Sequence, residues 1–398
     1  MLLSSFSMIA ASVGIGAADN AYKAGAEACA DALENLPDKK ADLLLVFGSI
    51  TFDQDKMIEG IKAIAPDTPM VGCSTAGEIS TEGLSTSKTV VIMAIKSDQM
   101  RFHTAAGHHI LWNSRQAGTD LASTIQYNSR NYASSALVFA DVISGGGEET
   151  IAGMQERLGI HFPLFGGAAS DDLLFFETYQ YLDGKVFSGS AVGVGFSGDY
   201  HVAGILSHGF FPIGLSHKVT RSQGGTLYEL DGLPAVSVYT DYFGEEHVGE
   251  LREGLLSNLA VNYPLGVFLP GSSDAIIRTP VFVDRKGAMT FTAAIPEGSE
   301  VRLMISGKEE GLESAETAAR NLLASLGGQQ PKAVLVINSV ARKKMLGLDA
   351  DEEIHIIQNV IGRDVPMAGF YSYAQVGGPY VDRVPFHNGG IMIVALAE

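Results

Sequence analysis

A short phrase recurs three times in this chain, and it restricts the possible folds more strongly than any other feature. The central copy runs from Pro163 to Asp172 (Pro-Leu-Phe-Gly-Gly-Ala-Ala-Ser-Asp-Asp), and related segments run from Pro69 to Glu78 and from Pro366 to Tyr373. Each copy has a proline, two apolar residues and a glycine, followed by small or polar residues. This pattern predicts a short buried strand that ends in a loop of close backbone approach.

An apolar run precedes each copy of the phrase. These runs end at Val46–Ser49, Val138–Asp141 and Val336–Ser339, and an amphipathic segment separates each from the following proline. The intervals suit a strand, a helix and a strand, the crossover unit that makes neighbouring strands parallel. We therefore expect an α/β protein of two related mixed-sheet domains, built on repeated βαβ units with antiparallel hairpin additions. Ligands in open α/β sheets bind beyond the carboxyl ends of the strands, so the polar strand tails are the first candidates for function.

The length of 398 residues allows two domains or one large domain. Glycine is abundant at 46 residues, and charged residues are sparse at 18%, against roughly 25% in average proteins. This composition favours a tightly turned, sheet-rich fold. Period-two and period-3.6 patterns predict further strands at residues 8–15, 89–95, 179–182, 191–196, 226–230, 278–283, 289–294 and 390–397, and helices at residues 20–36, 116–127 and 309–326.

Several local signals mark turns and joints. A G-x-G-x-x-G match at Gly193–Gly198 precedes an alternating strand pattern and not a helix, so we interpret it as a turn between antiparallel strands. Segment Phe210–Gly214 is a plausible joint between domains. We expect Pro234 in the first turn of a helix and a hairpin turn at Asp284–Gly287.

Charge and cysteine usage exclude several classes of protein. The formal net charge is −18 and the longest basic cluster is Arg342–Lys344, which argues against nucleic-acid binding. Two cysteines, Cys29 and Cys73, imply no disulfide framework and favour a reducing cytoplasm. The N-terminus has no Lys or Arg before Lys23, unlike a secretory signal, and no apolar run is long enough to span a membrane.

Taken in order, these motifs resemble a known family, the FIST proteins. The resemblance covers nearly the whole chain and implies a FIST N-terminal domain at residues 1–212 and a FIST C-terminal domain at residues 218–398. The motifs that carry it are Val46–Ser49, Val71–Glu78, Phe165–Asp172, Val219-Thr220, Asp231–Ala235, Gly369–Tyr373 and Phe386–Asn388.

The resemblance implies a sensory module of signal transduction that binds small ligands such as amino acids. FIST proteins occur in bacteria, archaea and eukaryotes; some bacterial members are haem proteins that sense nitric oxide, and some eukaryotic members follow an F-box. This chain carries no F-box, kinase, cyclase or methyl-accepting segment. We therefore expect a bacterial, cytoplasmic, non-enzymatic sensor that acts through a separate output partner such as a kinase or a cyclase.

The chain departs from the family pattern at two places. Where the C-terminal domain of the family usually has a Cys three residues before an Arg, this chain has Ser339 before Arg342, which excludes thiol chemistry there. Where the family's late motif continues into Gly-Glu, this chain has Ala374 and Gln375. The second change removes a carboxylate that could contact a cation or an amine.

We expect the ligand at the end of the third copy, where aromatic residues replace small ones. Tyr371 and Tyr373 are two apart, so on a strand both face one side and could line a pocket. Arg342 could hold a ligand carboxylate by two parallel hydrogen bonds. Alternatively, the tyrosines pack at a domain interface and Arg342 belongs to a solvated helix start. Further candidates for the polar head of the ligand are Asn338, Ser339, Ser372, Gln375 and Asn388.

The strand ends of the first two copies supply a second set of candidates: Cys73, Ser74, Thr75, Glu78, Gly166, Gly167, Asp171 and Asp172. Cys73 could be a nucleophile, or a small buried residue that fills a tight strand end. Asp141 and the Asp171-Asp172 pair could bind a hard cation. These alternatives describe a Cys-dependent acyltransferase and a metal-assisted hydrolase.

Two further alternatives concern cofactors and anions. Segment Ser144–Glu149 could be a phosphate cradle, but its two glutamates favour the start of a helix. We expect no cofactor, although a haem with one axial histidine stays open; among the ten histidines its candidate ligands are His201, His208 and His387.

Overall fold

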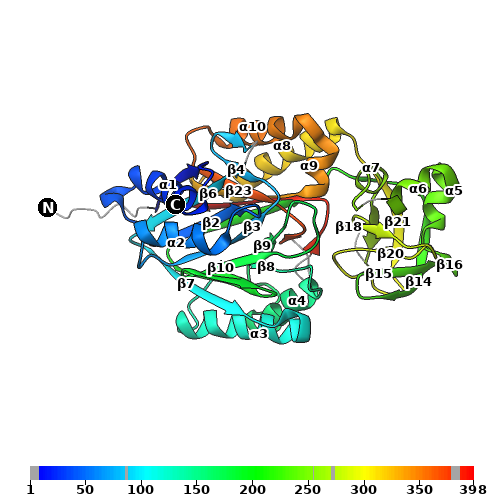
Figure 1. Cartoon of the computed structure of the whole chain (residues 1–398), viewed down its shortest axis with the longest axis horizontal. Coiled ribbons are helices and arrows are strands. Elements are labelled where there is room, and N and C mark those ends of the chain that lie inside the picture. Colours follow the sequence, from blue (N-terminus) through cyan, green and yellow to red (C-terminus); the bar gives the residue numbers. More distant parts are fainter. Residues whose placement is uncertain (1–8, 86–87, 254, 270–273, 378–385) are drawn as a thin grey trace.

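The structure, a computed structural model, describes residues 9–85, 88–253, 255–269, 274–377 and 386–398. These residues form a larger body of helices and sheets and a smaller body, residues 211–305, at one end of the molecule (Figure 1). The chain enters the smaller body after strand β13 (His201–Ser207) and returns to the larger body with helix α8 (Lys308–Ser325). The smaller body is therefore an insertion, and Phe210 lies at the entry, as the predicted joint requires.

The described part of the larger body consists of three units of one pattern. In each unit an outer strand, a helix, a strand, one or two helices and a strand precede a final antiparallel strand. Unit 1 contains β1 (Ile9–Gly16), α1 (Ala21–Glu34), β2 (Leu43–Ser49), α2 (Gln54–Ile64), β3 (Met70–Thr75) and β6 (Val90–Ser97). Unit 2 contains β7 (Met100–Gly107), α3 (Ile110–Asn128), β8 (Ser135–Ala140), α4 (Gly147–Leu158), β9 (Leu164–Ala168) and β12 (Ala191–Gly198). Unit 3 contains β13, α8, β22 (Pro331–Ser339), α9 (Val340–Leu346), α10 (Ala350–Ile361), β23 (Met367–Ser372) and β26 (Ile391–Ala397).

Each unit orders its strands in the same way. The orders are β1-β6-β2-β3, β7-β12-β8-β9 and β13-β26-β22-β23. The strand that ends in the recurrent phrase is parallel to its predecessor in every unit, and the final strand is antiparallel. The predicted βαβ repeats and the predicted α/β class with mixed sheets are confirmed.

The strands that follow each phrase do not stay with their own unit. β4 (Glu78–Ser80) and β5 (Gly83–Leu84) of unit 1 extend the sheet of unit 3, while β10 (Tyr179–Leu182) and β11 (Lys185–Ser188) of unit 2 extend that of unit 1. β24 (Gln375–Val376) and β25 (Phe386–His387) of unit 3 extend the sheet of unit 2. This cyclic exchange joins the three units into one body. The domain boundary expected at residues 212–218 lies within β14 (Phe211–Gln223), the first strand of the smaller body.

Three phenylalanines from the three sheets meet in the core of the larger body. The ring of Phe47 stacks on that of Phe370 at 4.8 Å between centroids, and Phe139 meets them edge-on at 5.7 and 5.8 Å. Each pair of parallel strands contributes one of these rings, opposite a residue without an aromatic ring. The pairs are Phe47 with Cys73, Phe139 with Gly167 and Ile337 with Phe370.

The smaller body is a twisted antiparallel sheet flanked by short helices (Figure 1). Its strand order is β18-β17-β21-β14-β15-β20-β19, with β16 beside β15. The elements not yet introduced are β15 (Thr226–Leu230), β16 (Leu233–Pro234), α5 (Ser237–Phe243), α6 (Glu245–Glu253), α7 (Asn258–Asn262), β17 (Leu265–Phe268), β18 (Ala275–Arg278), β19 (Phe282–Val283), β20 (Met289–Thr290) and β21 (Glu300–Ile305).

Most local predictions hold, and two need correction. The hairpin about residues 284–287 is confirmed by the pairing of β19 with β20, and the helix predicted at residues 309–326 is α8. Pro234 pairs with Glu229 in β16 instead of starting a helix, since α5 begins at Ser237. The glycines of Gly193–Gly198 lie within β12, between β7 and β8, and not in a turn. Among the described residues, no helix has the length and apolar character needed to cross a membrane.

Candidate functional site

Arg342 is a fully buried structural residue. Its Nε donates to Glu353 at 2.5 Å, its Nη1 to the carbonyl oxygen of His208 at 3.0 Å, and its Nη2 to Ser314 Oγ at 2.8 Å and to the carbonyl oxygen of Gly311. Both members of the Arg342–Glu353 ion pair have side chains with 0% exposure. Every nitrogen of this guanidinium is thus bound to the protein, so none is left to bind a ligand carboxylate as expected. The alternative, a solvated helix start, is also wrong because the side chain is buried.

The polar candidates around Arg342 are also bonded inside the protein. Asn338 donates to Glu353 at 2.6 Å, Ser339 caps α9, and Ser372 Oγ donates to the carbonyl oxygen of Ala374. The remaining candidates follow the same rule: Gln375 accepts from Gly390 N and donates to Ser372, and Asn388 donates to Thr292 and to the carbonyl oxygen of Tyr373. The structure brings this set together, but through hydrogen bonds within unit 3 and from Asn388 to the smaller body.

The two tyrosines of the third copy are buried as well. Tyr371 lies beneath the ammonium of Lys343, 5.1 Å from its ring centroid. Tyr373 stacks on Phe175 at 4.4 Å between centroids and donates its hydroxyl hydrogen to Asp171. The tyrosines therefore pack inside the larger body, Tyr373 against unit 2, and line neither the expected ligand pocket nor the alternative domain interface.

The strand ends of the first two copies are closed by hydrogen bonds. Ser74 Oγ donates to the carbonyl oxygen of Ser170 at 2.9 Å, and Ser170 Oγ donates to that of Tyr371 at 2.6 Å. Cys73 is fully buried, and burial raises the pKa of its thiol well above its ordinary value. Asp171 accepts the backbone N–H groups of residues 175–177.

Asp141 and Asp172 complete the expected carboxylate set, and they do not converge with Asp171 on one point. Asp141 accepts from Thr178 Oγ1 at 2.7 Å and from the N–H groups of Ile143 and Ser144 at 3.1 Å, while Asp172 is exposed in a left-handed backbone conformation. In the described part of the chain, no group of three or more His, Cys, Asp or Glu residues could hold a metal ion. Segment 147–158 is helix α4, as its two glutamates predicted.

Glu78 is a carboxyl group buried at the end of the first copy. It accepts hydrogen bonds from the hydroxyls of Thr75 and Thr89. Burial, opposed by these hydroxyls and by the nearby Lys343, raises its pKa to about 7. The carboxyl group is therefore partly protonated near neutral pH.

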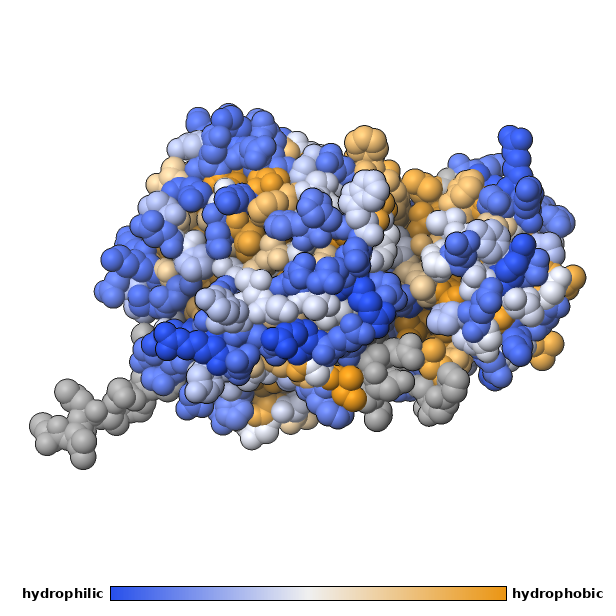
Figure 2. All heavy atoms as spheres, turned by 90° about the horizontal axis from the view of Figure 1, so that it is seen from below, coloured by the Kyte–Doolittle hydropathy of each residue, from blue (hydrophilic) through white to orange (hydrophobic). Residues whose placement is uncertain are grey.

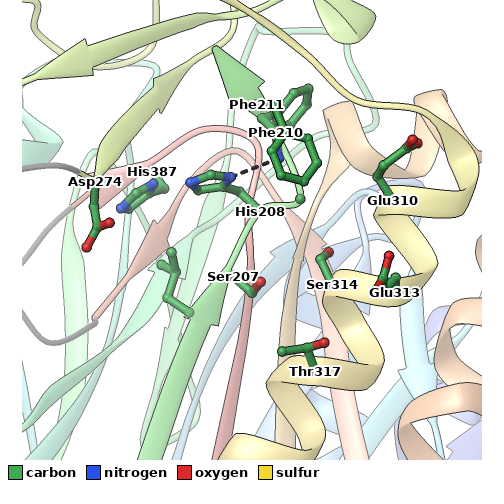
Figure 3. A pocket seen from close by; sticks show the side chains of 12 residues that line it. Ser207, His208, Phe210, Phe211, Asp274, Glu310, Glu313, Ser314, Thr317 and His387 are labelled. Carbon is green, nitrogen blue, oxygen red and sulfur yellow. Dashed lines mark hydrogen bonds between the residues drawn. The ribbon is translucent and has the colours of Figure 1, made fainter.

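A cavity of about 460 Å³ lies where the larger body meets the smaller body. Figure 3 shows its walls: the end of β13 with His208, helix α8, the start of β14, and Asp274 and His387. Its lining consists of residues 206–211, Asp274, Glu310, Glu313, Ser314, Thr317 and His387. Because both chain crossings between the bodies border the cavity, an occupant would contact both bodies at their joint.

Two histidines lie side by side at this cavity, with 6.3 Å between their ring centroids (Figure 3). Nδ1 of His208 accepts the N–H of Phe210 at 3.0 Å. Burial, with a smaller effect of Arg342, lowers the pKa of His208 to about 4, and burial lowers that of His387 well below its ordinary value. His208 is therefore neutral at physiological pH, and its proton resides on Nε2.

Among the described residues, the lining of this cavity carries three carboxylates and no Lys or Arg. Asp274 comes from the smaller body, whereas Glu310 and Glu313 come from α8. Glu310 also accepts the N–H of Gly307 at the start of that helix. Such a lining attracts a cation, while the hydroxyls of Ser207 and Thr317 offer neutral hydrogen bonds.

The sequence matches two family profiles that together span most of the chain. The FIST N domain matches residues 42–233, and the FIST C domain matches residues 235–377. The chain belongs to the FIST family. FIST domains are associated with sensing in signal transduction.

Three curated relatives of this FIST chain are described as uncharacterized proteins. Proteins of two Mycobacterium tuberculosis strains, CDC 1551 / Oshkosh and ATCC 25618 / H37Rv, are each 23% identical over 374 residues, which cover 92% of this chain and 94% of theirs. A protein of Methanocaldococcus jannaschii is 26% identical over 213 residues, 51% of this chain and 41% of its own.

Among solved structures, the FIST chain shows distant likeness to two cyanuric acid hydrolases. The one from A. caulinodans has 9% identity and a TM-score of 0.36, with 98% of this chain and 99% of that chain covered. The second has 7% identity and a TM-score of 0.39, with 98% and 100% covered. Likeness at this level carries no information about the chemistry of the FIST chain.

The FIST cavity does not fit a haem. A porphyrin needs apolar walls on both faces beside its axial ligand, whereas the lining here includes three carboxylates and several hydroxyls. His208 and His387 are brought together, but the third candidate, His201, is exposed at the start of β13.

Sequence reasoning overlooked most of this FIST cavity. Residues 310, 313, 314 and 317 have the spacing of one helical face, which was a usable signal for a polar stripe on α8. No comparable signal pointed to Asp274, because it reaches the cavity through the insertion.

Proposed function

We propose that this FIST protein is a small-molecule sensor of intracellular signal transduction that performs no chemistry of its own. The observation that carries the proposal is the 460 Å³ cavity at the joint between the two bodies. A ligand there would contact His208 at one chain crossing and α8 at the other, so its binding energy depends on how the bodies are placed. That dependence is what a sensor needs to pass a signal to a separate partner such as a kinase or a cyclase.

The ligand that best suits this cavity carries a positively charged amino group, and an amino acid belongs to this class. Asp274, Glu310 and Glu313 can neutralise an ammonium group. The Nε2–H of neutral His208 and the hydroxyl of Thr317 can donate to a carboxylate or carbonyl oxygen on the same molecule. The amino-acid ligand is thus retained as a proposal, with its site moved from Arg342 to this cavity.

The contacts at the other candidate sites favour a sensor over an enzyme. The Cys73 thiol is buried and its pKa is raised, whereas a nucleophilic cysteine needs a lowered pKa and access. Asp171 is bound by three backbone N–H groups and a tyrosine. The two free, buried cysteines agree with a cytoplasmic protein.

A thermal-shift panel tests the proposal. Wild-type protein is mixed with amino acids, simple amines, simple carboxylates and uncharged compounds, and we expect amino-bearing compounds to raise Tm. His208→Ala and Glu313→Gln should each remove that rise. The matched controls are His201→Ala and Glu309→Gln, which change exposed residues outside the cavity. A ligand whose effect survives both cavity substitutions would place the site elsewhere.

A further inference from the structure

A cavity of about 490 Å³, the unit-2 cavity, lies at the end of β7. Its lining consists of residues 108–109, 111–112, 144 and 187–190. It has the place in unit 2 that the cavity at the joint has in unit 3, because His108 directly follows β7 as His208 directly follows β13. The residues after them, His109 and Gly209, both have a left-handed backbone, with φ of 65° and 70°.

The neighbouring wall is also equivalent in the two units. Phe187 pairs with Gln180 in the hairpin of β10 and β11, and His387 pairs with Gln375 in the hairpin of β24 and β25. The side-chain oxygen of each glutamine accepts the backbone N–H that directly precedes the final strand of its unit. The repeated fold therefore forms the same cavity twice and lines it with different side chains.

Aromatic rings and hydroxyls line the unit-2 cavity in place of carboxylates. The rings of His108 and Phe187 lie 4.8 Å apart between centroids, and the ring of His109 lies 6.3 Å from that of His108. Within the described ranges of the chain, no Asp, Glu, Lys or Arg borders this cavity, and Ser144 and Ser188 contribute hydroxyls. A charged ligand would find no counter-charge there.

Two large side chains in the first turn of α3 are exposed beside these rings. Trp112 is 83% exposed and Leu111 is 66% exposed, and both line the unit-2 cavity. Figure 2 views the molecule from the side of α3 and shows a surface of the larger body on which hydrophilic residues predominate. An exposed indole that borders a cavity offers the ring of a ligand a face to stack on.

The hydrogen bonds of Ser190 determine which nitrogen of His108 carries the proton. Ser190 Oγ donates its single hydrogen to the carbonyl oxygen of Ser188 at 3.2 Å, so it accepts from Nδ1–H of His108 at 3.1 Å. Partial desolvation and the neighbouring His109 lower the pKa of His108, so the ring is neutral at physiological pH. Its Nε2 is therefore an acceptor, and it has no hydrogen-bond partner in the part of the chain that the structure describes. At the equivalent place in unit 3, Nε2 of His208 is a donor.

We propose that the unit-2 cavity binds a small uncharged aromatic compound whose N–H or O–H group donates to Nε2 of His108. The ring of the compound packs against the aromatic side chains of the lining, with Trp112 at the exposed side. This site goes beyond the proposed function, because it takes a different class of ligand from the cavity at the joint and does not depend on what binds there.

The fluorescence of Trp112 tests this proposal, because Trp112 is the only tryptophan in the sequence. Phenol has a ring and an O–H donor, anisole has the ring without the donor, and cyclohexanol has the donor without an aromatic ring. Benzoate and benzylamine add an anion and a cation. We expect phenol to change the emission of Trp112 saturably and to bind about fivefold more tightly than anisole, the scale of one hydrogen bond. Cyclohexanol and both charged probes should bind more weakly than phenol.

Three variants locate the site. His108→Phe keeps a ring but removes the acceptor, so phenol and anisole should bind it equally. His103→Phe is the matched control, because His103 also lies on the β7 side and is bonded to a serine, Ser197, but is outside the lining. His208→Ala should leave phenol binding unchanged, which separates this site from the cavity at the joint.

Four results would overturn the proposal: unchanged emission of Trp112 with phenol, equal affinity of wild type for phenol and anisole, binding of cyclohexanol or a charged probe as tight as that of phenol, or a preference for phenol over anisole that survives His108→Phe. The comparison of probes on wild type needs no variant, so a variant that fails to fold leaves the test intact.

Discussion

Glu78 and Gln375 occupy equivalent places in two sheets of the larger body. Glu78 lies opposite Phe370 in the sheet of unit 3, and Gln375 lies opposite Gly167 in the sheet of unit 2. Gln375 donates to Ser372 at 2.8 Å, whereas Glu78 accepts from a hydroxyl on either side. Unit 1 therefore has a buried carboxyl group at the position where unit 3 has a buried amide.

Replacing Glu78 by Gln should remove a pH dependence of stability. Burial raises the folded-state pKa of Glu78 from 4.5 to about 7, so the folded protein retains a proton that the unfolded chain has lost. Below about pH 4.5 the carboxyl group is protonated in both states and does not change the free energy of unfolding. As the pH rises from there to about 7, this group lowers the free energy of unfolding of wild type by about 3 kcal/mol.

Urea denaturation at several pH values measures this effect. Glu78→Gln should match wild type at about pH 4.5 and exceed it by about 3 kcal/mol at about pH 8. Glu82→Gln, at an exposed glutamate of the same segment, should change little at either pH. A difference between Glu78→Gln and wild type that does not vary with pH would contradict the raised pKa.

Gly166 should not tolerate a side chain. Its φ is +151°, and a Cβ there would come within 1.9 Å of the carbonyl oxygen of Val138 on the neighbouring strand. We expect Gly166→Ala to destabilise the protein by about 3 kcal/mol. Gly249→Ala serves as the control, because that helical glycine has no atom within 4 Å of an added Cβ. Equal melting temperatures of both variants and wild type would show that the strands do not approach so closely.

Gly167→Val should also unfold the protein, since its Cβ would meet Ile337 at 2.5 Å.

Loss of Arg342 should cost far more than loss of an exposed arginine. Arg342→Met leaves the Glu353 carboxylate buried without its counter-charge, and we expect a loss of about 3–5 kcal/mol in urea denaturation. Changing Glu353→Leu as well should recover part of that loss. Arg320→Met breaks an exposed pair with Glu316 and should change stability by less than about 1 kcal/mol. A small effect of Arg342→Met would mean that the guanidinium is not held inside the protein.

Neither cysteine should react with a thiol reagent while the protein is folded. Cys29 and Cys73 are fully buried, and burial raises the pKa of Cys29 to about 12 and that of Cys73 well above its ordinary value. At neutral pH, DTNB should therefore label them only after addition of urea. Rapid labelling of Cys73 in the folded protein would contradict its burial and would support Cys73 as a nucleophile.

The recurrent phrase by itself determined the local architecture. A proline, an apolar pair and a glycine encode a buried strand whose partner must approach closely, and the interval to the preceding apolar run encodes one crossover helix. These are interactions over a few tens of residues, so βαβ units, helix α8 and the hairpin at 284–287 were predictable. The same reasoning identified Cys73 as a residue that could fill a tight strand end.

Only the tertiary structure decided which sheet receives each trailing strand and which polar residues face a cavity. The three units present nearly equivalent edges, so the choice that puts Glu78 beside Phe370, and Gln375 beside Gly167, depends on packing of the whole body. From the sequence, Arg342 could bind a ligand carboxylate or lie at a solvated helix start. It is buried instead because Glu353, one helix later, and the carbonyl oxygen of His208, more than a hundred residues earlier, bind its guanidinium. The cavity at the joint joins residues 206–211, 274, 310–317 and 387, which the insertion and the strand exchange bring together. Spacing along a chain carries no record of such long-range contacts, because they arise only when separately folded elements pack.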